Sequence, residues 1–447
     1  MNSRWVGLAV CLLIAAAGLS LGTGCDPCAS CSGGGGKPTS SPTPAPNACL
    51  PSSSLSVLVQ GSNATAYLPQ GNWEEGAPAV NVVPIETGSG PGTGGAPIAI
   101  TTGSIPNSCS SNSLTGETVC VGNNTDVFLI NGTTLTSTVQ SSADATQFFS
   151  GGNCKNCGVV VDSTTNKALI TVGLSSGGPG GYQFLDLGGT PTFETPIPAG
   201  LGTSEDVSID PVRHLILSPN ESFENDGDSD YQIVNVSSST PAIFNNSLSS
   251  LGPQGWDSAG EDCTTGIALA TDEGTGNLFI ADLTQATFTP GTDGAPGTWT
   301  DPGSALVNFP EFEGLEAGTC GIAVAPGTHL AIVTGEFGGN LEGVVELPST
   351  SGSGTPAFPD YVAFTMPSPP TEEGWSQGFD PHTVTAYVSP NSKKAYGVLE
   401  NGDFSYVAIV DLQGLLNAPR TGPHTVTSPI PAGLVTFVCA IPGGCGT

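Results

Sequence analysis

The chain has 447 residues, enough for two or three ordinary domains or for one large repeat domain with a tail. Glycine and proline are frequent, with 63 and 38 residues, but an apolar fraction of 37% is too high for a disordered chain. Only 8 basic residues stand against 39 acidic ones. The resulting net charge of −31 argues against a nucleic-acid or anionic-lipid partner, because both are themselves negatively charged.

Residues 1–24 have the pattern of an export signal. Arg4 supplies a positive charge, residues 5–21 are apolar, and small residues lead to Cys25. Residues 19–25 resemble a bacterial lipobox, whose cysteine is lipidated and becomes the mature N-terminus, although Gly22 stands where that pattern has leucine. The sequence therefore predicts an outer-membrane or cell-surface lipoprotein attached through Cys25. A periplasmic or secreted protein without the lipid is the alternative.

Residues 25–48 are rich in glycine and then in proline, threonine and serine. This composition is typical of a flexible and then semi-extended tether. We expect the tether to join the anchor to a folded region that spans residues 49–447.

Thirteen cysteines in an exported chain are expected to be mostly oxidised. Cys109 and Cys120 flank a turn centred near residues 114 and 115, so a hairpin would place them directly opposite each other. This pair is the one that the spacing predicts best. Other pairs that the sequence allows are Cys154 with Cys157, Cys439 with Cys445, and Cys263 with Cys320.

Short apolar strands separated by turns recur along the folded region. Strand openings occur at 108–112, 158–162, 206–210, 266–270, 321–325 and, in divergent form, 382–390, with a weaker copy at 56–60. Each is followed by a turn and a second apolar strand, and four strands in roughly 40–60 residues are typical of a β-propeller blade. The sequence predicts an all-β protein with a single propeller of about seven four-stranded blades. Six blades is the alternative, because the first is poorly marked.

Some of these openings carry a resemblance to a known superfamily. Gly321-Ile-Ala-Val-Ala-Pro326, residues 381–390 and residues 406–412 look like the blade openings of YVTN/NHL-type and lactonase-like bacterial propellers. The similarity covers residues 50–440 in outline. It implies the propeller fold, but such short motifs are shared by proteins of many functions.

In a propeller, the loop entering each innermost strand and the loop leaving the second strand lie on the same face, around the channel mouth. We expect several carboxylates, two tryptophans and one histidine in these loops, and they could form a ligand or cation site. The residues of this predicted rim site are Glu205, Asp206, Trp256, Glu261, Asp262, Glu336, Trp375, Asp380, His382 and Glu400. The alternative is that the carboxylates are solvated and the tryptophan rings cap blade interfaces.

A second acidic group lies between residues 224 and 230. Asp226, Asp228 and Asp230 supply the hard oxygen ligands that Ca²⁺ prefers, and Gly227 permits a sharp turn among them. The segment is not an EF-hand, since no glutamate stands at the twelfth position. An acidic turn exposed to solvent is the alternative.

The sequence offers no convincing nucleophile. Gly173-Leu-Ser-Ser-Gly177 matches the pattern of a nucleophile elbow, but no helix follows it. The main hypothesis is therefore a monomeric, non-catalytic binding module whose partner is an envelope protein, a glycan or a small molecule. The rival is a Ca²⁺-dependent lactonase or other hydrolase, in which Glu205, Asp262 and Asp380 would hold the metal. A purely structural envelope protein is the third hypothesis.

Overall fold

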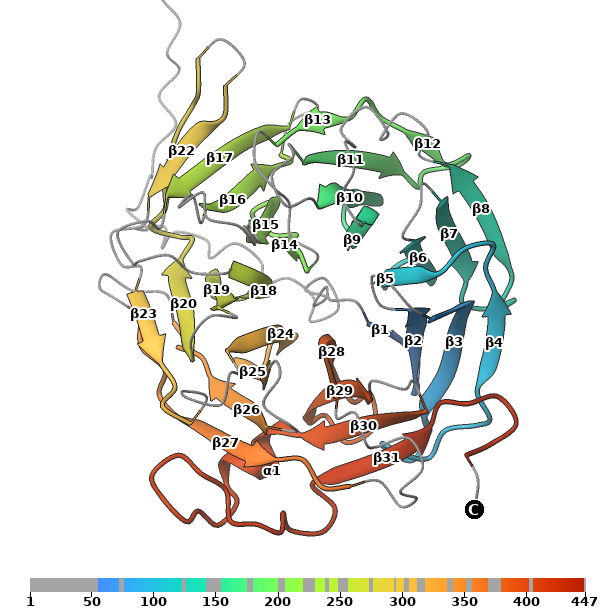
Figure 1. The fold of residues 1–447 in the computed structure, drawn as a ribbon, viewed down its shortest axis with the longest axis vertical. Coiled ribbons are helices and arrows are strands. Elements are labelled where there is room, and N and C mark those ends of the chain that lie inside the picture. Colours follow the sequence, from blue (N-terminus) through green and yellow to red (C-terminus); the bar gives the residue numbers. More distant parts are fainter. Residues whose placement is uncertain are drawn as a thin grey trace, which may run out of the picture. The chain divides into compact units, whose positions relative to one another are not determined.

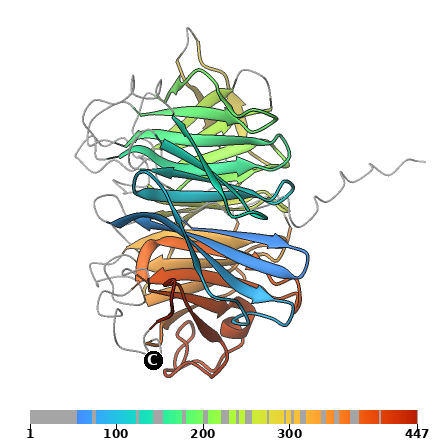
Figure 2. The same cartoon turned by 90° about the vertical axis from the view of Figure 1, so that its right-hand side faces the viewer.

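A computed structural model describes residues 55–71, 76–122, 126–141, 154–174, 180–199, 206–219, 230–237, 241–247, 256–272, 276–292, 295–300, 305–311, 318–335, 341–350, 356–368, 379–401 and 405–445. In these residues, seven antiparallel sheets stand around a central axis as the blades of a propeller (Figure 1). The predicted fold is confirmed, and the chain has seven blades rather than six. Figure 2 shows the same blades viewed from the side of the ring.

Six of the seven blades are built from strands that follow one another in the chain, and in blade 5 the hairpin β21–β22 stands between the third and the outermost strand. The innermost strands are β1 (Ser56–Gln60), β5 (Pro106–Asn112), β9 (Cys154–Asp162), β14 (Ser208–Asp210), β18 (Trp256–Asp262), β24 (Thr319–Ala325) and β28 (Phe379–Val388). The second strands are β2 (Asn63–Gly71), β6 (Glu117–Gly122), β10 (Lys167–Leu174), β15 (Leu215–Pro219), β19 (Ile267–Asp272), β25 (Leu330–Gly335) and β29 (Ala395–Asn401). We number the blades 1 to 7 in this order.

The outer half of each blade follows the same plan. The third strands are β3 (Gly76–Thr87), β7 (Asp126–Asn131), β11 (Gly181–Asp186), β16 (Asp230–Asn235), β20 (Asn277–Asp282), β26 (Leu341–Glu346) and β30 (Tyr406–Asp411). The outermost strands are β4 (Ile98–Thr101), β8 (Ser137–Ser141), β12 (Thr192–Phe193) with β13 (Ile197–Pro198), β17 (Ala242–Ser247), β23 (Ala305–Asn308), β27 (Tyr361–Thr365) and β31 (Val435–Cys439). The short helix α1 (Leu412–Leu416) follows β30 directly. In the described part of the chain, no helix is long and apolar enough to cross a membrane.

Seven apolar clusters hold the ring together, and one lies in each junction between neighbouring blades. Successive side chains of a strand point to opposite faces, so one strand contributes to two junctions. Val159 and Val161 pack against blade 2, whereas Val160 between them packs against blade 4. Strands buried on both faces need continuous apolar runs rather than alternation, which explains the run Val159 to Val161.

Most innermost strands contain an irregular step near their first residues. The strand pairing shifts in blades 2, 3, 5, 6 and 7 at this point. In three blades a threonine of the second strand accepts the amide hydrogen that the step releases: Gly158 N to Thr171 Oγ1 at 2.7 Å, Ser258 N to Thr271 Oγ1 at 3.0 Å, and Gly321 N to Thr334 Oγ1 at 2.8 Å. The bulge is therefore a repeated feature with its own hydrogen bond.

Two long connections reach back to the preceding blade and cover its outer edge. In blade 5, the hairpin of β21 (Thr287–Thr289) and β22 (Gly297–Thr300) pairs in parallel with β17 of blade 4, and β22 projects from the rim of the ring (Figure 1). In blade 7, residues 424–426 run along β27 of blade 6, where Ala363 N donates to His424 O at 2.6 Å. In both places a segment of the following blade pairs in parallel with the outermost strand of the preceding blade. This pairing covers backbone groups that an open sheet edge would leave unpaired.

The strands of blade 5 differ from those expected. Residues 266–270 were predicted to open the innermost strand, but Ile267–Asp272 is the second strand, β19, and the innermost strand is β18 (Trp256–Asp262). The sequence of β18 contains Asp257, Ser258 and Glu261, so it lacks the apolar pattern that marks the other inner strands. Its polar side chains instead bond to the neighbouring blades, as described below.

The predicted disulfide between Cys109 and Cys120 is confirmed: the two residues are partners in the β5–β6 ladder, and both are completely buried. Cys439 and Cys445 also form the predicted disulfide. The predicted pair of Cys263 with Cys320 is wrong, since Cys263 is disulfide-bonded while Cys320 carries a thiol that donates to Asp257 Oδ2 at 3.0 Å. The side chains of Cys154 and Cys157 are outside the described set, as is Cys25, so these assignments stay predictions.

Candidate functional site

The predicted rim residues do not all lie at the same end of the propeller. Asp206, Trp256 and Glu400 lie where the chain enters the innermost strands or leaves a second strand, as expected. Glu261 and Asp262 lie at the opposite end of β18, where the chain turns into β19. The prediction that they belong to the channel entrance is therefore wrong, and it failed because β18 begins ten residues before the predicted strand opening at Gly266.

The described rim residues at the entry end are buried and contact neighbouring blades. The Trp256 ring is completely buried in the cluster between blades 4 and 5, with its centre 5.8 Å from that of Phe279. Glu400 Oε1 accepts a hydrogen bond from Gln70 Nε2 of blade 1 at 3.2 Å. For Trp256, the interpretation as a cap of a blade interface describes its position.

The other predicted residues lie outside what the structure describes. Glu205, Glu336 and Trp375 are not among the described residues, and neither are Asp226 and Asp228. Asp380 and His382 lie in β28 and Asp230 begins β16, but their side chains are not described. Within the described part of the chain, no group of three or more His, Cys, Asp or Glu residues could hold a metal ion.

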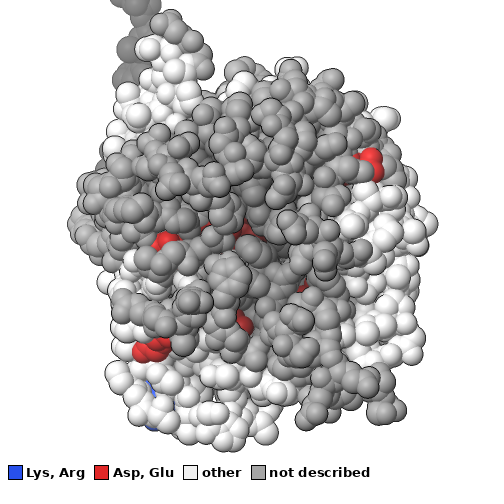
Figure 3. Space-filling model, in the orientation of Figure 1, with Lys and Arg blue, Asp and Glu red and all other residues white. Residues whose placement is uncertain are grey.

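Among the described residues that are visible in Figure 3, most of the charged atoms belong to Asp and Glu. This agrees with the excess of 39 acidic over 8 basic residues. An acidic face attracts cations and basic surfaces over a range of about 10 Å at moderate salt.

A row of Asp and Asn residues ends the inner strands at the opposite end of the propeller. Asn112, Asp162, Asp210 and Asp262 each close the turn that follows their strand, because one side-chain oxygen accepts backbone N–H groups two and, in all but one case, three residues later. Such Asx turns fix the geometry of the first-to-second strand connection. Sequence reasoning missed this row, although each of the four is followed four positions later by Gly, Asn or His.

The residue four positions later adopts a left-handed backbone conformation. Its φ is 75° at Gly116, 57° at Asn166, 55° at His214 and 80° at Gly266, which is the region that Gly, Asn and His tolerate best. His329 has a φ of 59° at the equivalent turn of blade 6. The Nδ1 atoms of His214 and His329 lie 3.6 Å from Asp162 Oδ2 and 2.5 Å from Asp262 Oδ2, so both side chains face the preceding blade.

In three of these turn residues, the side-chain oxygen or nitrogen that does not bind the turn forms another polar contact. Asn112 Nδ2 donates to Asn166 Oδ1 of blade 3 at 2.6 Å, and His329 Nδ1 of blade 6 lies 2.5 Å from Asp262 Oδ2. Asp210 Oδ2 accepts from Arg213 Nη1 at 2.6 Å, and the same nitrogen donates to Cys263 O of blade 5 at 3.1 Å. Polar contacts thus link blade to blade around this end of the channel.

Glu261 is a buried carboxyl group in the junction between blades 4 and 5. Burial is the main cause that raises its pKa well above 4.5, the negative charge of Asp210 adds to it, and the charge of Arg213 acts in the opposite direction. Burial therefore favours the neutral form of Glu261 over a wider pH range than for an exposed glutamate.

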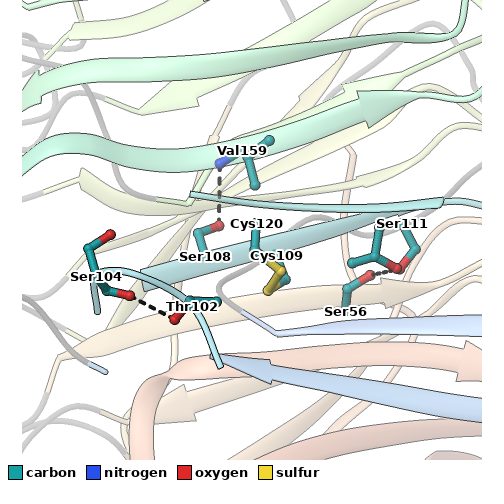
Figure 4. Close-up of a disulfide and its surroundings, with 9 residues drawn as sticks. Ser56, Thr102, Ser104, Ser108, Cys109, Ser111, Cys120 and Val159 are labelled. Atoms are coloured by element: carbon teal, nitrogen blue, oxygen red, sulfur yellow. Dashed lines mark hydrogen bonds between the residues drawn. A yellow bond between two sulfur atoms is a disulfide. The ribbon is translucent and has the colours of Figure 1, made fainter. Parts of the chain in front are cut away.

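Serine hydroxyls make a second set of contacts between inner strands. Ser108 Oγ accepts from Val159 N at 3.3 Å beside the buried Cys109–Cys120 bond, and Ser56 Oγ donates to Ser111 Oγ at 2.8 Å (Figure 4). Ser110 and Ser258 accept in the same manner from Val161 N and Ile322 N. Small hydroxyl side chains let inner strands approach closely and still satisfy backbone donors.

No protein-family model and no curated protein sequence matches this chain. Among solved structures, the RRP9 WD40 repeats share 10% identity over 79% of this chain and 88% of that one, with a TM-score of 0.48. Hydrazine synthase of Kuenenia stuttgartiensis shares 11% over 78% and 92%, with a TM-score of 0.46. The Cps50 (Swd1) β-propeller domain of Myceliophteria thermophila shares 7% over 79% and 94%, with a TM-score of 0.47. Likeness at this level carries no argument about activity, so the seven sheets of the chain itself establish that it is a β-propeller.

Proposed function

We propose that this chain is an exported, lipid-anchored β-propeller that binds a protein partner in the cell envelope and catalyses no reaction. The observation that carries the proposal is that described acidic side chains of the innermost and second strands form hydrogen bonds inside the ring. Glu400, Asp210, Asp262 and Asp257 each contact a hydrogen-bond donor within the ring, in most cases from another blade. These carboxylates maintain a rigid ring, and a rigid ring with an acidic surface is suited to binding.

The chemistry of the partner follows from charge. A net charge of −31 favours a partner with a basic surface. Charges at the edge of a binding interface mainly change the association rate and its dependence on salt. A protein with a basic patch is the partner we propose. A neutral glycan or an uncharged small molecule would bind with little dependence on ionic strength.

Anchoring and binding are tested separately on the full chain. Wild type and Cys25→Ala are produced in a bacterial host that lipidates exported proteins, and membranes are separated from soluble fractions. Wild type is expected in the membrane and the variant in the soluble fraction, whereas equal distribution would exclude an anchor at Cys25. A photo-crosslinking residue at Leu114, which is 70% exposed at the tip of a turn, then identifies neighbours. A purified neighbour must bind the soluble variant, and its affinity must fall as salt rises.

The calcium hypothesis at Asp226, Asp228 and Asp230 stays a prediction. A ligand that binds only the folded state stabilises it by about 2.7 kcal/mol at a hundredfold excess over its Kd. The melting temperature of the full chain is therefore measured with Ca²⁺ and with a chelator, for wild type, Asp228→Asn and, as a control, Asp186→Asn. A shift that only Asp228→Asn abolishes would support a metal at this cluster and would justify an assay of lactone hydrolysis.

A further inference from the structure

The ring closes between blades 7 and 1, and the last described residues of the chain take part in that junction. β31 is the outermost strand of blade 7 (Figure 1), and Ala440, the residue after it, is completely buried in the apolar cluster shared with blade 1. Asn81 of β3 donates from Nδ2 to Ala440 O at 3.0 Å, and this contact is buried. The end of the last strand is therefore part of the contact that closes the ring.

The residues that follow Ala440 form an exposed loop that a disulfide closes. Ile441 is 40% exposed, and the next three residues are exposed as well. Gly443 and Gly444 have φ values of 98° and 99°, so the chain bends back and brings Cys445 to Cys439. All five residues of β31 are only half-buried, because β31 stands at the outer edge of its sheet. The ends of such strands fray unless a contact fixes them, and the disulfide fixes this one.

The Cys439–Cys445 bond is open to chemical attack. Both of its residues are partly exposed, whereas Cys109 and Cys120 are completely buried. A thiolate of a small dithiol can attack one sulfur atom and release the other, and the second sulfur of the dithiol then displaces the first cysteine. The dithiol is thereby oxidised to a cyclic disulfide, and each cysteine takes up one of the two protons that the dithiol gives up. A dithiol is therefore the class of reductant that can open this loop.

We propose that the Cys439–Cys445 bond is a redox-sensitive clasp that holds the junction between blades 7 and 1 closed. In the oxidised protein it fixes the end of β31, and Ala440 O stays within reach of Asn81. Reduction frees the loop, so the strand end should open on the order of tenfold more often, as expected for the loss of a bond across 6 positions of the chain. Asn81 loses its acceptor at each opening. The clasp concerns the ring itself and does not depend on the proposed function.

Urea unfolding of the full-length protein measures the coupling between the disulfide and Asn81. Wild type and the double variant Cys439→Ser/Cys445→Ser are each compared with and without Asn81→Ala. We expect Asn81→Ala to shift the urea midpoint of the double variant by less than about half as much as that of wild type, because the acceptor is then already displaced. Tyr182→Phe is the control, since it removes the 2.5 Å hydrogen bond to Gln232 between blades 3 and 4 and should shift both midpoints equally. Equal shifts for Asn81→Ala, or an equal attenuation for Tyr182→Phe, would overturn the proposal.

Hydrogen exchange followed by peptide mass spectrometry tests the clasp without any cysteine variant. Wild type is treated with dithiothreitol until alkylation shows Cys439 and Cys445, but not Cys109 and Cys120, as thiols. We expect the backbone amides of β31 to exchange at least about tenfold faster than in the oxidised protein, and those of β3 around Asn81 to exchange faster as well, while β19 and β20 of blade 5 stay unchanged. Faster exchange confined to residues 435–445 would show that the disulfide holds only the tail and would overturn the proposal. No change, or an equal acceleration in blade 5, would overturn it too.

Discussion

Ser389 Oγ of blade 7 donates to Glu86 Oε1 of blade 1 at 2.7 Å, and this contact lies where the last blade meets the first. Tyr387 and Asn391 donate to the same carboxylate at 3.1 and 2.6 Å, and Glu86 is completely buried. Blades 1 and 7 share no strand, because β1 to β4 form one sheet and β28 to β31 form another. Side chains therefore close the ring, with Glu86 at the centre of the polar contacts.

Glu86→Ala is expected to destabilise the protein strongly. The change leaves three donors of blade 7 without their acceptor at a buried position, so the free energy of unfolding should fall by about 3 kcal/mol or more. Urea unfolding followed by circular dichroism measures this fall. Glu346→Ala, at a half-buried glutamate of blade 6, is the control, and equal midpoints for the two variants would show that Glu86 does not hold the ring closed.

Glu261 should make stability depend on pH. Burial raises its pKa above 4.5 in the folded protein, so the folded state retains a proton that the unfolded state releases. Stability should then fall as pH rises above 4.5, by up to about 1.4 kcal/mol per pH unit, until the pH passes the folded-state pKa. Urea midpoints of wild type and Glu261→Gln are compared between pH 5 and pH 7. The variant should have the flatter profile, and parallel profiles would contradict this account.

Trp299 should hold the β21–β22 hairpin against blade 4. The ring is 1% exposed, its Nε1 donates to Tyr231 O at 2.7 Å, and its centre lies 5.7 Å from the Tyr231 ring. Trp299→Ala is expected to cost about 3–5 kcal/mol and to expose residues 287–300 to limited proteolysis. Trp299→Phe keeps an aromatic ring but loses the hydrogen bond and part of the packing, so its effect should be smaller. If the protease cuts this segment of wild type and Trp299→Ala at the same rate, the ring does not anchor the hairpin.

The two described disulfides should differ in their resistance to reduction. Cys109 and Cys120 are completely buried, whereas Cys439 and Cys445 lie partly exposed near the C-terminus. Thiol attack requires access to a sulfur atom, so a mild reductant should open the Cys439–Cys445 bond first. Alkylation of the native protein followed by peptide mass spectrometry gives the order. If all four cysteines were labelled at one rate, the buried bond in the β5–β6 hairpin would be as accessible to the reductant as the Cys439–Cys445 bond.

The sequence by itself predicted the all-β class, the propeller, seven blades and the pairing of Cys109 with Cys120. These features depend on local information, since an apolar run such as Val159 to Val161 and the turn that follows it mark a buried hairpin wherever it occurs. The sequence did not predict β18 as a strand, because Asp257, Ser258 and Glu261 interrupt the apolar pattern. For the same reason, Glu261 and Asp262 were expected at the wrong end of their blade.

Only the tertiary structure showed which polar groups meet across the junctions between blades. Asp262 and His329 are 67 residues apart, and Glu86 and Ser389 are 303 residues apart, so no periodicity in the chain indicates that they touch. Asn112, Asp162, Asp210 and Asp262 occupy equivalent turns and look alike in the sequence. The packing of the next blade decides which of their second polar atoms finds a partner. The geometry of the ring, rather than the local sequence, therefore sets which partner each of these residues meets, such as His214 for Asp162 and His329 for Asp262.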